Sequence, residues 1–478
     1  MIYLEDLYEE SWGHKMQTIQ EFYEGQDVFI TGGTGFLGKV LIEKLARSCH
    51  GIKNIYVLMR PKKGMDVQQR LEAIYNTRLF DRIKKECPEN MKKIVAVPGN
   101  CMELQLGLSA SDRRMLEENV SIIFHSAASV RFDDSLTYAT LMNTRGAREM
   151  MMLARNMKKL KALVHVSTCY CNCDRQEIDE ILYPPHADWR EIIKMVETLD
   201  EYTLNILTPK ILNNLPNTYI FTKSMAEHVV NDLGENIPRA IFRPSIVVNT
   251  TEDPFVGWID NFNGPVGLLV AGAKGVVKVS YGYHDTILDL IPVDLAIKIM
   301  IVSAWKVANS GSSSEPFICH GASGTKKRMT LEKIIEMGLK YCEQIPFENM
   351  IWKESGIVTN NIVRYYCRLI YTQLIPAVFL DSIIKLSGHQ PLLMKLHRRI
   401  FQAQIALHYF VNNTWLFNNE NLFELRKGIP ECDKDEFGAE GIEYVDEEEI
   451  FRNFLIGSRT YLMKEDPATI PQAKVHRT

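Results

Sequence analysis

The sequence predicts an α/β protein, a doubly wound parallel sheet followed by a mainly helical C-terminal domain. Three observations support this fold class. Short apolar runs recur over roughly residues 20–300 with helical patterns between them, as expected of parallel strands joined by crossover helices. A cluster of glycines directly follows the first run. From about residue 350 to 465 the chain is rich in Leu, Ile, Tyr and Phe at helical spacing.

The glycine cluster lies in the stretch DVFITGGTGFLGKV, residues 27–40. Val28–Ile30 predicts a buried strand, and the apolar spacing after it predicts a helix from about Lys39 to Cys49. Two glycine fingerprints overlap between them, G-x-G-x-x-G at Gly33, Gly35 and Gly38, and G-x-x-G-x-x-G at Gly32, Gly35 and Gly38. Glycine lets the backbone turn tightly and approach a pyrophosphate, which the helix N-terminus attracts. A simple glycine-rich turn is the alternative, but the strand–turn–helix context favours a dinucleotide-binding Rossmann unit.

Further strands follow along the chain. They are predicted at Ile55–Met59, Ile94–Val97, Ile122–His125, Leu163–Val166 and Ala240–Phe242. The second strand leads into Arg60, Lys62 and Lys63, where an NAD enzyme usually carries a carboxylate for the ribose 2′-hydroxyl. Cations here favour a 2′-phosphate, so the sequence predicts NADPH, with a solvated basic turn as the alternative. After the fourth strand, the small residues Ser126, Ala127 and Ala128 allow close approach of a flat ring.

Three polar residues then form a candidate catalytic set. Thr168 ends the fifth strand, and Tyr219 and Lys223 are four residues apart, so they share one helix face. The lysine charge is expected to lower the pKa of the phenol and the lysine to hold the nicotinamide ribose, while Thr168 shares hydrogen bonding to the same substrate oxygen. Chance is the alternative reading of Y-x-x-x-K, and it is weakened by the order of the motifs.

A long insertion, residues 170–216, separates Thr168 from Tyr219, and it is predicted to cover the active site. Its acidic composition does not suit the phosphates of coenzyme A. The run Cys169, Cys171 and Cys173 is interpreted as strand-end cysteines, because zinc pairs need wider spacing and a second ligand pair. No metal is therefore predicted.

Composition indicates an ordinary globular protein. The chain has 478 residues, 46% hydrophobic and 24% charged, with a net charge of −4, so nothing argues for nucleic acid as a partner. The N-terminus does not resemble a signal peptide, which favours a reducing, intracellular compartment. The apolar segment Ile362–Leu386 carries four charged residues and is expected to be broken by Pro376. No transmembrane helix is predicted, and peripheral membrane contact through this region stays open.

Longer motifs extend these signals over residues 20–465. They are RPKKG (60–64), NTYIFTK (217–223), RPSIV (243–247), GWIDNFNGPVGLL (257–269), DLIPVD (289–294), LIPAVFLDSI (374–383) and YFVNNTWLFNN (409–419). Together with the glycine turn and the Thr168, Tyr219 and Lys223 set, they resemble the alcohol-forming fatty acyl-CoA reductases of animals, within the extended short-chain dehydrogenase/reductases.

The resemblance implies an activity and further site residues. NADPH-dependent reduction of a long-chain fatty acyl-CoA would give the primary alcohol through an aldehyde, by two hydride transfers at one site, with release of coenzyme A. It implies Asn143, in NTRG, as fourth catalytic member and a C-terminal domain that helps house the acyl chain. It also implies association with an endoplasmic-reticulum or peroxisomal surface. The cofactor contacts it implies are Thr31, Gly32, Gly33, Thr34, Gly35, Phe36, Leu37, Gly38, Arg60, Lys63, Asn100 (where the family usually has Asp), Ser126, Ala127, Ala128, Lys223, Pro244 and Ser245.

Two other classes of function remain as alternatives. One is another extended reductase, either an aldehyde-forming acyl-CoA reductase or an oxidoreductase for a sterol or sugar nucleotide. The other is a non-catalytic scaffold that senses NADPH. The intact set Thr168, Tyr219 and Lys223 argues against a sensor, which has no need of an acid or a charge at these positions.

Overall fold

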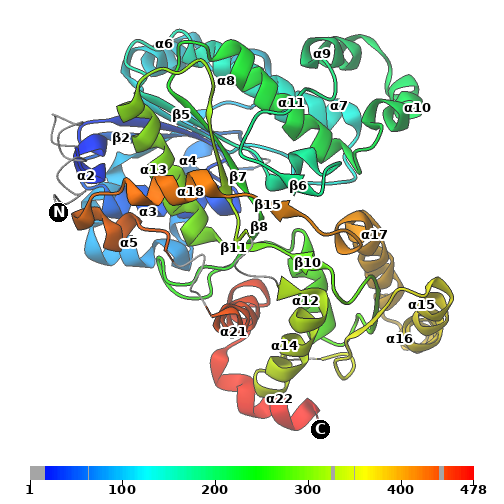
Figure 1. Ribbon diagram of the computed structural model, residues 1–478. Helices are drawn as coiled ribbons and strands as arrows, with labels where there is room; N and C mark the ends of the chain where they lie inside the picture. The colour runs from blue at the N-terminus through cyan, green and yellow to red at the C-terminus, as the bar shows by residue number, and fades with distance from the viewer. Residues whose placement is uncertain (1–16, 63, 325–328, 349, 441–445, 478) are drawn as a thin grey trace, which may run out of the picture.

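A single parallel sheet organises the upper part of the molecule in the computed structural model, which describes residues 17–62, 64–324, 329–348, 350–440 and 446–477. Within these residues seven strands pair in the order β12-β7-β5-β4-β1-β2-β3 (Figure 1). Their bounds are β1 Asp27–Thr31, β2 Asn54–Met59, β3 Ile94–Pro98, β4 Ile122–His125, β5 Ala162–Val166, β7 Arg239–Pro244 and β12 Phe317–Gly321. The strand order reverses between β1 and β4, which is where doubly wound sheets bind their ligands.

Both faces of the sheet are buried under helices, as all-parallel sheets require. Alternate residues of β1 show the division, because Val28 and Ile30 join one apolar core and Phe29 joins the other. The first core contains α3 Phe36–Ser48 and α13 Val293–Ser310, and the second contains α8 Gly146–Ala154 and α11 Thr218–Leu233. The doubly wound fold predicted from the sequence is therefore confirmed.

The six predicted strands are confirmed to within two residues at each end. The seventh, β12, was not predicted. It pairs with β7 in parallel, Phe317 opposite Ala240, although more than seventy residues separate the two in sequence. A five-residue run with such a distant partner carries no local signal of its own, so only the completed sheet identifies it as a strand.

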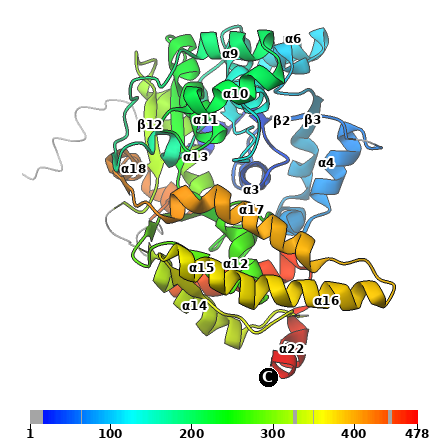
Figure 2. The ribbon, with the colours of Figure 1, turned by 90° about the vertical axis from the view of Figure 1, so that its right-hand side faces the viewer.

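A second, mainly helical lobe lies beneath the sheet (Figures 1 and 2). It contains α12 Pro265–Ala273, α14 Leu331–Gln344, α15 Ile362–Leu369, α16 Ile375–Leu386, α17 Leu393–Val411, α21 Glu447–Gly457 and α22 Ile470–Arg477. Between α17 and α21 the chain returns to the sheet, where α18 Glu420–Lys427 packs against β12 and α13. The helical character predicted for the C-terminal region is confirmed.

The apolar segment Ile362–Leu386 forms one continuous helix of 25 residues. The expectation that Pro376 breaks it was wrong. A π-helical turn, η6 Ile370–Leu374, joins α15 to α16, and Ile375 N–H donates to the carbonyl of Ile370. This wider turn places Pro376 in the first turn of α16, where a missing N–H is tolerated. By length and composition the helix is apolar enough to cross a membrane, a weak indication, and 22% of its most apolar stretch is buried.

Candidate active site

A cavity of about 530 Å³ lies at the carboxyl ends of the strands, next to β1 and β4, between which the strand order reverses. Most of the predicted site residues line it. They are Gly32, Thr34, Gly35, Phe36, Leu37, Gly38, Arg60, Asn100, Ser126, Ala127, Ala128, Thr168, Tyr219, Lys223, Pro244 and Ser245. Residues separated by up to 213 positions in sequence thus share one wall, because parallel strands end at the same edge of the sheet.

The glycine turn has no room for side chains. Gly32 has φ +74°, and a Cβ added there would lie 2.7 Å from the backbone N of Ala127. A Cβ on Gly38 would overlap the carbonyl of Gly32, so helix α3 could not approach the turn. Gly35 is the N-cap of α3 and has no side-chain cap, which leaves the first N–H groups of that helix directed at the cavity. The turn therefore fits a pyrophosphate.

Two predicted cofactor residues, Thr31 and Gly33, lie behind the turn and do not line the cavity. The Thr31 hydroxyl is 2.7 Å from Nδ1 of His125, and its carbonyl accepts a hydrogen bond of 2.8 Å from Ser126 Oγ. A Cβ on Gly33 would clash with Val57 of the neighbouring strand. These residues hold the turn against β2 and β4.

A second cation, missed by the sequence analysis, accompanies Arg60. Helix α4, Val67–Tyr75, brings Arg70 beside it, and the Arg70 guanidinium donates to the carbonyl of Arg60. Both residues line the cavity, and burial, then the Arg60 charge, lowers the pKa of Arg70. The sequence feature that could have revealed Arg70 is its position on a helix that directly follows the basic turn. Lys63, predicted at the same place, lies outside the described residues.

The catalytic set predicted from the sequence is brought together. Asn217 caps α11 by accepting from Ile220 N–H at 2.9 Å, and this start places Tyr219 and Lys223 on the cavity side. Burial raises the pKa of the Tyr219 phenol, Cys171 adds to the rise, and a hydrogen bond with Thr168 opposes it. The phenol is therefore a protonated donor at neutral pH.

Lys223 is held at the end of β5. Its ammonium group donates to the carbonyl of Val166 at 2.5 Å and lies 3.4 Å from His165 Nε2. Burial lowers its pKa to about 8, against the opposing charges of Glu227 and Cys171. Burial is the largest influence on the pKa of Tyr219 and raises it, so the lowering by the Lys223 charge stays a prediction.

Asn143 does not line the cavity. It lies in the π-helical turn η4, Thr140–Arg145, a local geometry common at functional sites. Its amide oxygen accepts from Ser129 N–H at 2.8 Å, and its amide nitrogen donates to Thr222 Oγ1 at 3.0 Å. Asn143 thus joins the loop after β4 to the turn of α11 that carries Lys223.

Aromatic side chains that the sequence analysis did not single out cover the catalytic end. The ring of Phe132 stacks on Tyr219, with centroids 5.8 Å apart. Phe410, from α17, lies 5.2 Å from Phe132 and 5.4 Å from Tyr170. The insertion 170–216 was expected to provide this cover, but only its first residue, Tyr170, lines the cavity. Its helices α9 Trp189–Thr198 and α10 Glu201–Leu212 pack on the outside of the domain instead.

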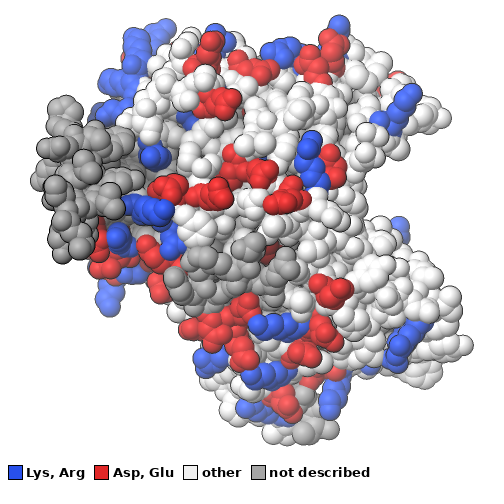
Figure 3. All heavy atoms as spheres, in the orientation of Figure 1, with Lys and Arg blue, Asp and Glu red and all other residues white. Residues whose placement is uncertain are grey.

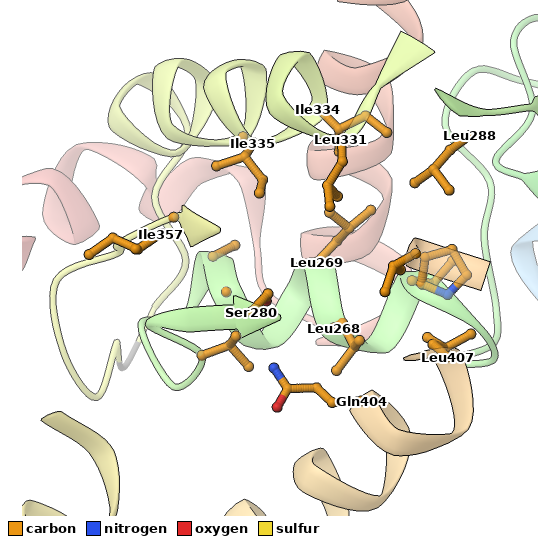
Figure 4. A pocket seen from close by; sticks show the side chains of 18 of the residues that line it. Leu268, Leu269, Ser280, Leu288, Leu331, Ile334, Ile335, Ile357, Gln404 and Leu407 are labelled. Carbon is orange, nitrogen blue, oxygen red and sulfur yellow. The ribbon is translucent and has the colours of Figure 1, made fainter. Parts of the chain in front are cut away.

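A second cavity, of about 290 Å³, lies next to the first, in the helical lobe. Leu268 and Leu269 of α12, Ile334 and Ile335 of α14, and Leu407 of α17 surround it, so its wall is largely hydrocarbon (Figure 4). Pro265 and Leu407 line both cavities, so the two spaces are neighbours.

Comparisons with known proteins agree with this architecture. Residues 30–300 match the NAD-binding family described as male sterility protein, and residues 372–465 match the Sterile family with the same description. Two solved structures share the fold. The terminal R domain of a myxalamid PKS-NRPS pathway aligns with a TM-score of 0.60 and 18% identity over 91% of each chain. The R domain of a Mycobacterium tuberculosis nonribosomal peptide synthetase aligns with a TM-score of 0.58 and 18% identity over 91% of this chain and 92% of that one. Fold and site together define a nicotinamide-dependent reductase of the extended short-chain type.

Sequence relatives define the family more narrowly. Fatty acyl-CoA reductase 1 of Homo sapiens is 35% identical over 461 residues, which is 96% of this chain and 89% of the relative. Fatty acyl-CoA reductase wat of Drosophila melanogaster is 37% identical over 455 residues, 95% and 87% of the two chains. The chain belongs to the fatty acyl-CoA reductase family and is an oxidoreductase.

The buried Lys223 generates a prediction about pH and stability. Its pKa falls from the ordinary 10.5 to about 8 on folding, so between these values only the unfolded chain holds the proton. Stability therefore rises with pH through this window, and below pH 8 the folded protein carries the cost of a buried charge. We compare the unfolding of the parent and Lys223→Met from pH 7 to 9.5 and expect the parent to gain about 2 kcal/mol of stability relative to the variant over this range.

The exposed Lys159→Met is the matched control, and its melting curve should track the parent at every pH. Parallel pH profiles for the parent and Lys223→Met would show that Lys223 keeps its ordinary pKa.

Proposed function

We propose that the protein reduces long-chain fatty acyl-CoA to the primary alcohol with NADPH, through an aldehyde and two hydride transfers at one site. The observation that carries this proposal is the adjacency of the two cavities, which share Pro265 and Leu407 as lining residues. A polar cleft with Tyr219, Thr168 and Lys223 adjoins a hydrocarbon-lined space, the division that a fatty thioester requires. The relatives named fatty acyl-CoA reductases support the same substrate class.

The chain's own residues divide the work. The Gly32–Gly38 turn and the start of α3 hold the pyrophosphate, and Arg60 with Arg70 holds the 2′-phosphate. When bound, NADPH supplies a hydride to the carbonyl carbon. Tyr219 donates a proton to the oxygen as negative charge develops on it, and Thr168 provides a second hydrogen bond.

Each reduction is balanced by one hydride and one proton. The first adds hydride to the thioester carbon, the carbon–sulfur bond then breaks, and coenzyme A leaves as the thiol with an aldehyde remaining. The second adds hydride and a proton to that aldehyde to give the alcohol. Lys223 positions the nicotinamide ribose, and Asn143, through Thr222 and the Ser129 loop, keeps the α11 turn and the loop after β4 in register.

The product is the direct test. Burial of an acyl chain contributes roughly 0.8 kcal/mol per methylene, so the cavity should retain long aldehydes between the two reductions. With a series of acyl-CoAs we expect about two NADPH oxidised per long-chain substrate, with alcohol as the product by lipid analysis. Short chains should release aldehyde to a carbonyl-trapping reagent. A ratio near one, with long-chain aldehyde accumulating, would indicate an aldehyde-forming reductase instead.

Cofactor preference tests the two arginines. Charge-assisted hydrogen bonds contribute about 1.5–3 kcal/mol each, so Arg60→Ala or Arg70→Ala should raise the NADPH KM about tenfold or more. The NADH KM is the internal control and should change little, because NADH has no 2′-phosphate. Equal effects on both cofactors would place the arginines elsewhere than at that phosphate.

The acid is tested by Tyr219→Phe, which removes one hydroxyl and little volume. Loss of a general acid typically lowers the rate by about 10²–10⁴-fold, so kcat should fall by that amount. NADPH binding, measured by fluorescence titration, and the melting temperature should stay close to the parent's. If kcat remains within a few-fold, another group supplies the proton.

Gly272 offers a test of the acyl site that leaves the catalytic residues untouched. It lies in α12 and lines the hydrocarbon cavity, and a Cβ added there meets nothing within 4 Å. Gly272→Leu should fill part of the cavity and move the preferred acyl-CoA to shorter chains, measured as kcat/KM across a chain-length series. Gly272→Ala, the matched control, should keep the parent's profile. An unchanged profile for both variants would place the acyl chain outside this cavity.

A further inference from the structure

The outer face of the long helix in the lower lobe is apolar and exposed. This helix, α15–η6–α16, presents Val363, Tyr371, Phe379 and Leu386 with exposed fractions of 68%, 71%, 66% and 88%. Further exposed apolar residues on the same helix are Ile362, Tyr366, Ile370, Ile375, Val378 and Ile383. Soluble monomers rarely leave a contiguous apolar patch of this kind uncovered.

Only a narrow stripe of the helix contacts the rest of the protein. Its buried residues recur at every fourth position, Tyr365, Leu369, Gln373, Ala377 and Asp381. On an α-helix of 3.6 residues per turn such a stripe would drift by about 40° at each step. The π-helical turn at Ile370–Leu374 has more residues per turn and reduces that drift. One side of the helix is thereby kept against the protein, and the opposite side is exposed.

The same region is strongly basic. Residues 362–413 carry six cations, Arg364, Arg368, Lys385, Lys395, Arg398 and Arg399, and one acidic residue, Asp381, although the whole chain has a net charge of −4. The Asp381 carboxylate is buried and accepts hydrogen bonds from the N–H groups of Leu392, Leu393 and Met394. It therefore caps α17 and does not offset the outward charge. In Figure 3 the lobe that carries α15 and α16, at lower right, is largely white with blue groups.

The exposed face is continuous with the hydrocarbon-lined cavity. Ile362 and Tyr366 of α15 and Ile405 of α17 are exposed, and all three also line that cavity. In Figure 2, α15 and α16 form the outer layer beneath α17. An apolar surface thus leads from the outside of the molecule to the space that we assign to the acyl chain.

We propose that α15–η6–α16 and the neighbouring part of α17 form a docking surface for an anionic lipid bilayer. An exposed helix with apolar side chains between basic ones lies in the plane of a membrane interface, with its apolar face among the acyl chains and its cations at the phosphates. The long Lys and Arg side chains reach the headgroups from a partly immersed helix. The buried stripe packs this helix along the lobe, so it rests on the bilayer and does not span it.

The docking surface stands independently of the enzymatic proposal. If the cavity also holds the acyl chain, docking would open it toward lipid, where a fatty alcohol partitions. Binding is measured on the full chain without substrate or NADPH, so its failure is distinct from a failure of the proposed function.

The experiment is flotation of the protein with vesicles of phosphatidylcholine, alone or mixed with phosphatidylserine. We expect binding to the mixed vesicles that weakens as salt rises, and weaker binding to neutral vesicles. Ile375→Asp/Phe379→Asp should lower the partition coefficient about tenfold or more, since each charge must leave water. Arg364→Gln/Lys385→Gln should lower binding to mixed vesicles by about fivefold per cation and leave neutral vesicles little affected.

A matched control is available on α10, where Tyr202 and Ile206 are also exposed apolar residues four positions apart, with exposed fractions of 76% and 62%. Tyr202→Asp/Ile206→Asp should bind vesicles like the parent. Melting temperature and NADPH binding confirm that each variant is folded. Equal losses for the two Asp pairs, or no preference of the parent for anionic vesicles, would overturn the proposal. Self-association of the parent through this face would also overturn the proposal. It would appear in sedimentation as a mass above that of the monomer, which falls to the monomer mass only in Ile375→Asp/Phe379→Asp.

Discussion

The contact between the Gly32 turn and the backbone of Ala127 is the constraint on which the site depends. Because Gly32 has no Cβ, the turn after β1 can lie directly against the loop after β4. In this position the turn leaves the first N–H groups of α3 open to an anion. The carboxyl ends of β5 and β7 then lie along the same edge of the sheet. The residues that we propose as catalytic lie at that edge, Thr168 just after β5 and Tyr219 and Lys223 on α11 beside it.

A second dependence links the two lobes through aromatic packing. Phe410 of α17 touches Phe132, whose ring stacks on Tyr219, so the helical lobe closes the catalytic end of the cleft directly. The same helix contributes Leu407 to both cavities. Displacement of α17 would therefore alter the surroundings of Tyr219 and the wall of the hydrocarbon cavity together, which would couple the proposed acyl site to the proposed chemistry.

Two features of the chain reduce its stability, one in the proposed active site and one on the proposed docking surface. Lys223 is buried, and its pKa is lowered to about 8. The long helix α15–η6–α16 leaves its apolar side chains in solvent, an arrangement that a bilayer surface would stabilise. At these positions the residues present are not the ones that would give the folded protein its greatest stability.

The sequence by itself determined the glycine turn, six of the strands and the spacing of Thr168, Tyr219 and Lys223, since each depends on short-range periodicity and on what glycine alone permits. Tertiary structure decided the rest. It paired β12 with β7, set Arg70 beside Arg60, and raised the phenol's pKa by burial. It also covered Tyr219 with Phe132, backed by Phe410 of α17, in place of the 170–216 insertion. These features depend on contacts between segments far apart in sequence and on the exclusion of water by those contacts. A local pattern of residues carries information on neither.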